Sequence, residues 1–276
     1  MADKDRSVLP GISLSGGEHA VLLVHGLTGS PQELRFLAKR LNQAGYTVQV
    51  PYLAGHGTDL KDLMKTTWQD WHASMRDVFC SLAKTYSTVS VAGLCMGAVI
   101  ALHLAHEFPE KIPAVALLST TLFYDGWTVP WYTFLLPYAY YTPLRYFYTY
   151  PETEPYGVKN EKIRQRIKKS LDEEAGAYAK FPLSSMAEHL RMNRHVRKLM
   201  PAIMTPALII HSHEDDMASV KNAEYLQQHL GSTVVRTVLL DDCYHMITVD
   251  NQREQVAQEL IDFLNARLVV SSENCH

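Results

Sequence analysis

Short apolar runs alternate along this chain with longer segments of mixed polarity. The apolar runs have the length and composition of buried strands, and they cover residues 20–24, 46–50, 89–92, 115–118, 207–211 and 234–240. The segments between them have helical spacing or helix boundary signals, as in residues 32–44, 68–86, 98–106, 218–230 and 252–268. Strands that alternate with helices predict an α/β fold, with a mostly parallel sheet flanked by helices on both faces.

The alternation stops between residues 120 and 200. This segment begins with an aromatic cluster and continues with charged helical stretches at residues 161–174 and 185–199. The chain contains no linker long enough to divide it. We therefore expect a single domain, residues 1–276, with residues 120–200 inserted over the sheet.

The aromatic cluster has two interpretations. Its 13 aromatic residues lie between residues 121 and 150, where they either form the core of the insertion or line an apolar channel. A channel of this kind would accept a hydrophobic substrate, because ligand pockets are mostly apolar with few polar groups. The candidate substrate-binding residues are Trp127, Trp131, Tyr132 and Tyr138.

The composition is that of an ordinary globular protein. The chain has 276 residues and a formal net charge of -3, which gives no indication of a nucleic-acid partner or of an anionic membrane surface. The first residues lack the apolar region of a signal peptide, and no apolar run reaches the ~18 residues of a membrane span. The four cysteines lack metal-binding spacing, so we expect reduced thiols, a cytoplasmic location, no metal and no cofactor.

A sharp turn between a strand and a helix is predicted at Gly93-Leu94-Cys95-Met96-Gly97. In that context a Gly-x-nucleophile-x-Gly pattern indicates a nucleophile elbow. The two glycines let the backbone pass close to itself on either side of a strained residue, whose side chain then stands clear of the sheet. A buried structural cysteine is the alternative, and it would be the simpler interpretation without the flanking strand and helix. Cys95 is therefore the candidate nucleophile.

Such a nucleophile needs a base, and the base needs an acidic residue that orients it. In the chain order of α/β-hydrolases, the acid and then the histidine follow the nucleophile in loops after late strands. The loop after residues 207–211 contains Glu214, Asp215 and Asp216, of which we favour Asp215. The loop after the next strand contains His245. All three candidates would then meet at the edge of the sheet where open α/β folds bind ligands.

Two backbone amides are candidates for holding the oxyanion of a tetrahedral intermediate. Met96 follows the nucleophile at the N-terminus of a helix, where the helix dipole also favours negative charge. Leu27 lies in the loop after the first long strand, within the stretch His25-Gly26-Leu27-Thr28-Gly29. The alternative for this stretch is a glycine-rich turn without a catalytic role.

Five motifs together resemble the carboxylesterase and monoacylglycerol-lipase branch of the α/β-hydrolase superfamily, namely HGLTGSP, LAGHGT, GLCMG, HEDD and YHMITVD. The resemblance covers most of residues 20–268 and is weakest between residues 120 and 200. It implies Leu27 and Met96 as the oxyanion hole, Asp215 as the acid, His245 as the base and the insertion as a lid. The chain departs from this family at Cys95, where the family has serine.

Cysteine in place of serine changes the expected chemistry. A thiolate–imidazolium pair can be the resting state of such a site, and the acyl-enzyme would be a thioester. A thiolate leaves a tetrahedral intermediate more easily than a simple alkoxide. We therefore expect activated acyl groups, such as thioesters and aryl esters, to react best unless His245 protonates the leaving alcohol efficiently.

The origin of Cys95 has two explanations. Dienelactone hydrolases and polyhydroxyalkanoate synthases are similar in using cysteine at this turn, which favours a native catalytic residue. A serine replaced by cysteine in the laboratory is the other explanation, and the sequence does not separate the two.

These observations predict an acyl hydrolase, either an esterase or a thioesterase, that forms an acyl-cysteine intermediate. Its substrate would be a hydrophobic small acyl compound, free or bound to a carrier protein. One alternative is an acyltransferase or cyclase that passes the acyl group to an alcohol, amine or thiol. Another is a ligand-binding protein of the hydrolase fold with little turnover, and the intact order of nucleophile, acid and base argues against it.

Overall fold

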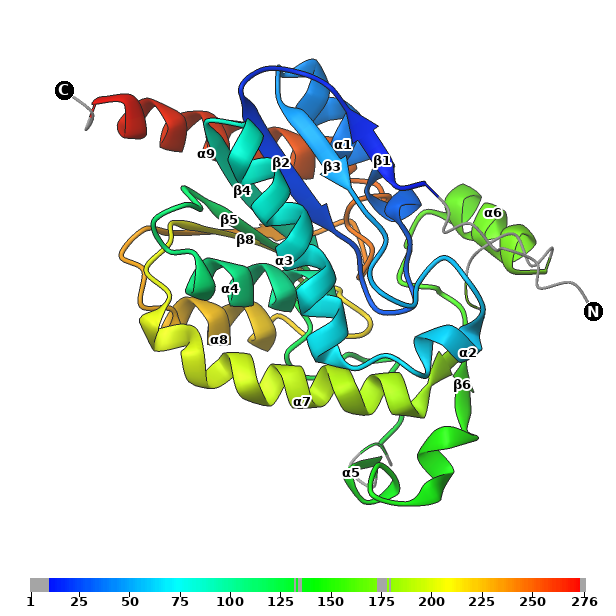
Figure 1. Ribbon diagram of the computed structural model, residues 1–276. Helices are drawn as coiled ribbons and strands as arrows, with labels where there is room; N and C mark the ends of the chain where they lie inside the picture. The colour runs from blue at the N-terminus through cyan, green and yellow to red at the C-terminus, as the bar shows by residue number, and fades with distance from the viewer. Residues whose placement is uncertain (1–9, 132, 134–135, 173–177, 179, 274–276) are drawn as a thin grey trace, which may run out of the picture.

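The computed structural model describes residues 10–131, 133, 136–172, 178 and 180–273. Its centre is a seven-stranded sheet in the order β1-β3-β2-β4-β5-β8-β9 (Figure 1). The strands are β1 (Ile12–Leu14), β2 (His19–Val24), β3 (Thr47–Val50), β4 (Thr88–Leu94), β5 (Val115–Leu118), β8 (Ala207–Ser212) and β9 (Val235–Leu240). Within the described residues only β1, at the edge, runs antiparallel to its neighbour, so the predicted mostly parallel sheet is confirmed.

Helices cover both faces of this sheet (Figure 1). One face packs against α3 (Trp68–Thr85), α4 (Met96–Glu107), α7 (Leu183–Leu199) and α8 (Lys221–His229), and the other against α1 (Arg35–Gln43) and α9 (Arg253–Glu273). Successive strand residues alternate between the two cores, so Leu22 lies in the first and Leu23 in the second. Burial on both faces explains why the central strands β2, β4, β5 and β8 are mostly apolar.

Some element boundaries differ from the expected ones. The helix expected from residue 98 begins at Met96, because the chain turns into α4 directly after Cys95. The segment expected as one helix at residues 32–44 begins as a 3-10 turn at Pro31–Leu34, which Ser30 and Glu33 cap reciprocally, and continues as α1. The short α2 (Leu60–Leu63) was not expected, since four residues show no periodicity.

The segment between β5 and β8 holds the remaining elements. These are α5 (Leu136–Ala139), a 3-10 turn at Pro143–Tyr146, α6 (Glu161–Asp172), α7, and an antiparallel pair formed by β6 (Thr149–Pro151) and β7 (Lys180–Pro182). In Figure 1, α5 and the turn after it lie beyond α7, on the side away from the main sheet. The chain then returns through β6 and β7 to α7, which packs against α3 and α4. The β6–β7 pair was not expected either, because its strands are three residues long and far apart in sequence.

Candidate active site

Cys95 occupies a strained turn between β4 and α4. Its backbone angles are φ 56° and ψ −117°, a conformation that residues other than glycine rarely adopt. The flanking glycines make the turn possible: a Cβ at Gly93 would overlap the carbonyl group of Gly97, and a Cβ at Gly97 would overlap the carbonyl oxygens of Val24 and His25. The local geometry is therefore that of a nucleophile elbow.

The loops after β8 and β9 bring an acid and a base together. His245 Nδ1 lies 2.8 Å from Asp215 Oδ2 and 3.0 Å from Asp215 Oδ1, and both residues are almost completely buried. The backbone amides of Met217 and Ala218 also donate to Asp215 Oδ1. Asp216 binds only the backbone of the histidine, accepting from His245 N at 3.2 Å. Of the three acidic candidates, Asp215 is the one whose carboxylate contacts the imidazole.

The electrostatics of the pair favour a charged histidine. Burial lowers the pKa of His245, but the negative charges of Asp215 and Cys95 raise it more, and the pKa lies well above the usual 6.5. Burial raises the pKa of Asp215, but the neighbouring His245 outweighs it and the pKa lies below the usual 3.8. An imidazolium is thus held beside an ionised carboxylate, ready to balance a thiolate.

The thiol of Cys95 lies near His245. Its Sγ atom is 3.2 Å from Thr121 Oγ1, in the segment that follows β5. His245 Nε2 is buried and has no hydrogen-bond partner of acceptable geometry among the described residues. Cys95 is nevertheless close enough to raise the pKa of His245. Both side chains line the same cavity, so a reacting group placed there would meet thiol and imidazole together.

The two candidate oxyanion amides belong to the two segments next to Cys95. Met96 is the first residue of α4, and Leu27 belongs to the loop after β2, whose Gly26 would place a Cβ only 3.3 Å from the Cβ of Cys95. Among the described residues, neither amide donates a hydrogen bond to the protein. Unpaired amides beside a nucleophile are what an oxyanion hole requires.

His25 holds the loop after β2 in place. Its Nδ1 lies 2.9 Å from the carbonyl oxygen of Gly26, and its Nε2 accepts a hydrogen bond from Leu53 N at 3.1 Å. Complete burial and then the neighbouring His56 lower the pKa of His25 to about 3, so its ring is neutral and can accept this bond. The HG pair of the first motif therefore connects this loop to the LAGHGT loop.

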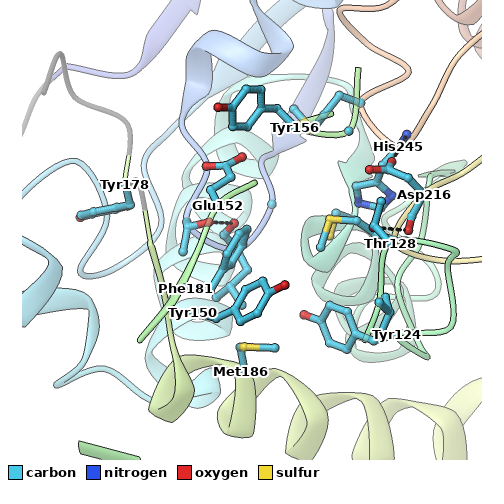
Figure 2. A pocket seen from close by; sticks show the side chains of 18 of the residues that line it. Tyr124, Thr128, Tyr150, Glu152, Tyr156, Tyr178, Phe181, Met186, Asp216 and His245 are labelled. Carbon is cyan, nitrogen blue, oxygen red and sulfur yellow. Dashed lines mark hydrogen bonds between the residues drawn. The ribbon is translucent and has the colours of Figure 1, made fainter. Parts of the chain in front are cut away.

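A cavity of about 790 Å³ opens above Cys95 and His245. Most of its wall is apolar or aromatic, and it is formed by the loop after β2, the segment after β5, the β6–β7 region and one side of α7. Figure 2 shows Tyr124 on the same side of this cavity as His245, with Tyr150, Glu152 and Phe181 on the opposite side. A cavity of this size and lining suits a substrate with a long apolar part.

Three of the four aromatic residues selected from the sequence do not lie on the cavity wall. Trp127, Trp131 and Tyr138 have 61%, 82% and 75% of their surface exposed and do not line the cavity. Tyr132 lies outside the described residues. A high content of aromatic residues indicates that the insertion is apolar. Because these residues have no regular spacing, the sequence does not show which rings face the cavity.

Several polar residues of the site had no signal in the sequence. Thr121, which contacts the thiol, and Tyr124, which lines the cavity, follow β5 at positions where no motif marks them. Glu33 and Glu152 also line the cavity. Burial is the main cause that raises the pKa of Glu33 to about 8, helped by the charge of Glu152, and burial raises the pKa of Glu152 to about 7.

Within the described ranges, no group of three or more His, Cys, Asp or Glu side chains could hold a metal ion. No helix in this part of the chain is both long enough and apolar enough to cross a membrane.

The sequence of this chain is similar to those of known proteins. A family model described as "Serine aminopeptidase, S33" matches residues 17–252. A thermostable monoacylglycerol lipase of Bacillus sp. (strain H-257) is 30% identical over 258 residues, which cover 90% of each chain. A carboxylesterase of Bacillus subtilis (strain 168) is 26% identical and covers 91% of this chain and 94% of its own.

Solved structures show the same fold. One, from a study of the metagenome-derived lipolytic enzymes LipS and LipT, has a TM-score of 0.80 and 27% identity, covering 94% of this chain and 98% of its own. A monoacylglycerol lipase of Paleococcus ferrophilus has a TM-score of 0.78 at 18% identity, with 93% and 98% covered. The predicted α/β-hydrolase fold is confirmed.

Proposed function

This chain belongs to the family described as "Serine aminopeptidase, S33", within the esterase and monoacylglycerol-lipase branch of the α/β-hydrolases, and from that membership we propose that it hydrolyses esters through Cys95. Hydrolysis of ester bonds is the activity of this branch and of this chain. The cysteine nucleophile, the acyl-cysteine intermediate and the substrate class belong to the proposal. The proposal rests on the Asp215–His245 pair, which lines an apolar cavity together with Cys95, a residue whose backbone is strained.

The proposed reaction has two stages. The Cys95 thiolate attacks the acyl carbon, a C–S bond forms, and the carbonyl electron pair moves onto oxygen, where the amides of Leu27 and Met96 bind it. The C–O bond then breaks and the alcohol leaves with the proton of His245. In the second stage His245 takes a proton from water, the hydroxide attacks the thioester, and the C–S bond breaks. Asp215 keeps the imidazole oriented throughout.

The substrate in this proposal is a carboxylic ester or thioester with a hydrophobic acyl chain. The apolar cavity supports it, and so do the names of the relatives, which are a monoacylglycerol lipase and a carboxylesterase. Monoacylglycerols are therefore the first natural esters to assay. The thioester intermediate also allows transfer to an alcohol, amine or thiol, which product analysis with added acceptors separates from hydrolysis.

A cytoplasmic location remains a prediction from cysteine usage. In the part of the chain that the structure describes, Cys80, Cys95 and Cys243 are all free thiols, which is consistent with a reducing compartment. Cell fractionation tests this directly.

The test of the proposed function is steady-state kinetics with monoacylglycerols, p-nitrophenyl esters and acyl thioesters of several chain lengths. We expect turnover by the wild-type protein and a loss of roughly a thousandfold or more in Cys95→Ala. Cys80→Ala is the matched control, since Cys80 is a partly buried thiol outside the cavity. Equal activity of Cys95→Ala and wild type would overturn the proposal.

A further inference from the structure

Tyr124 and His189 form a second polar pair in the wall of the cavity. Tyr124 Oη lies 2.7 Å from His189 Nδ1, and the two rings meet edge to face at 88° with centroids 5.6 Å apart. His189 is completely buried in α7. Tyr124 belongs to the segment after β5 and points into the cavity in Figure 2. The hydroxyl group is thereby held in one place beside an otherwise apolar surface.

Tyr124 lines the same cavity as Cys95 and His245. Burial is the main cause that raises the pKa of Tyr124 well above 10, and the charge of Cys95 is the next cause. Burial and then the charge of His245 lower the pKa of His189 to about 3. The phenol therefore keeps its proton and the imidazole stays neutral. When the neutral imidazole carries its proton on Nδ1, it donates to Tyr124 Oη and leaves the phenol O–H free to donate into the cavity; with the proton on Nε2, Nδ1 would instead accept the phenol O–H.

Ester cleavage by a thiol creates a need for such a donor. From the tetrahedral intermediate, the thiolate of Cys95 is a better leaving group than an alkoxide, so the intermediate tends to return to the ester. Any group that lowers the energy of the departing alkoxide more than that of the thiolate shifts this partition toward product. His245 supplies the proton, and a second hydrogen bond to the same oxygen would assist it.

We propose that Tyr124 is a catalytic hydrogen-bond donor to the alcohol oxygen of the ester, and that His189 is the residue that positions it. This proposal rests on the proposed function of Cys95. As the C–O bond breaks, its electron pair moves to the alcohol oxygen, which receives the proton of His245. Tyr124 retains its own proton and contributes only the hydrogen bond.

The experiment compares esters and thioesters that share one acyl chain but differ in leaving group. Tyr124→Phe removes the hydroxyl group and keeps the ring. We expect kcat/KM for alkyl esters to fall roughly tenfold to a hundredfold. For p-nitrophenyl esters and thioesters, whose leaving groups need little assistance, we expect a fall of less than about threefold. A plot of log kcat/KM against the pKa of the leaving group then becomes steeper.

Tyr225→Phe is the matched control. Tyr225 lies on α8 and packs edge to face on Phe123, next to Tyr124 in sequence, but it does not line the cavity. We expect this variant to keep the wild-type slope. His189→Leu should steepen the slope in the same way as Tyr124→Phe, which a purely structural role would not do. Thermal unfolding shows whether Tyr124→Phe folds. If it does not fold, His189→Leu takes its place in the comparison of leaving groups.

The outcomes separate the two proposals. An unchanged slope in Tyr124→Phe, or an equal loss with every leaving group, overturns the role of Tyr124. If Tyr124 has no such role but wild-type turnover still depends on Cys95, the proposed function stands and only the role of Tyr124 is lost. If Cys95→Ala keeps wild-type activity, the proposed function and this inference both fail.

Discussion

Asp215 holds the imidazole of His245 with both carboxylate oxygens within 3.0 Å of Nδ1, whereas the adjacent Asp216 contacts only the backbone amide of His245. Two neighbouring carboxylates thus have different relations to one histidine. One orients the ring, and the other helps to hold the loop that carries it. The distinction matters because the two residues are equivalent in the sequence motif.

The first prediction separates these roles by substitution. Asp215→Asn removes the charge that raises the pKa of His245 and can reverse the tautomer of its ring. We expect kcat to fall by roughly three orders of magnitude or more, as in other triads that lose this charge. Asp216→Asn should lower kcat by less than about tenfold, because its backbone contact does not touch the ring. Equal losses in the two variants would contradict the assignment.

The second prediction concerns the identity of the nucleophile. In Cys95→Ser the tetrahedral intermediate carries two similar alkoxide leaving groups, one from the introduced serine and one from the ester alcohol. Its breakdown to product therefore no longer competes with the easier loss of a thiolate. We expect the ratio of kcat/KM for an alkyl ester to that for a thioester to rise, by about tenfold or more. Kinetics with both substrates on both proteins measure this ratio. If wild type already turns over the alkyl ester as fast as Cys95→Ser does, the leaving-group argument is wrong.

The third prediction is a dependence of stability on pH that arises from Glu33. Burial, and then the charge of Glu152, raise the pKa of Glu33 from 4.5 to about 8 in the folded protein. The unfolded chain loses this proton near pH 4.5, so the stabilising contribution is complete below that pH and is lost as the pH rises to about 8.

Glu33→Gln keeps the shape of this side chain and removes its titration. We expect the variant to match wild type in Tm near pH 4 and to exceed it near pH 9. Glu110→Gln, at an exposed position, is the control and should follow wild type at both values. Parallel Tm profiles of Glu33→Gln and wild type from pH 4 to pH 9 would rule out this role for Glu33.

The fourth prediction tests the packing of the elbow. A Cβ at Gly97 would overlap the backbone carbonyl oxygens of Val24 and His25, and backbone atoms move less readily than side chains. We expect Gly97→Ala to lower the free energy of unfolding by at least about 2 kcal/mol. Ala98→Gly, one position along α4, should cost about 1 kcal/mol. Denaturant unfolding measures both values, and a Gly97→Ala protein as stable as wild type would show that the elbow can relax.

The sequence predicted the sheet because its strands are buried on both faces. Runs such as residues 115–118 and 207–210 are apolar without interruption, and the elbow motif stands between a clear strand and a clear helix. Chain order then led to Asp215 and His245, which the structure places in contact. These features are local or follow from the order of parallel strands.

The rest of the site depends on tertiary packing. Tyr124 and His189 are 65 residues apart in sequence, and they meet because the fold brings α7 against the segment after β5. Glu33, in the 3-10 turn before α1, and Glu152, in the insertion, line the same cavity and interact electrostatically. Trp127 and Trp131 belong to the same aromatic cluster as Tyr150 but face solvent. No periodic pattern in this insertion distinguishes an inward from an outward aromatic ring.

The central claim is that Cys95 forms a covalent acyl intermediate. The most direct measurement is intact-protein mass spectrometry after rapid mixing with p-nitrophenyl esters and acyl thioesters, using Cys95→Ala and Cys80→Ala beside wild type. We predict a mass increase of one acyl group in wild type and Cys80→Ala, cleaved by hydroxylamine, and none in Cys95→Ala. An acyl adduct on Cys95→Ala, or wild-type turnover of every donor without an adduct at any mixing time, would contradict the claim.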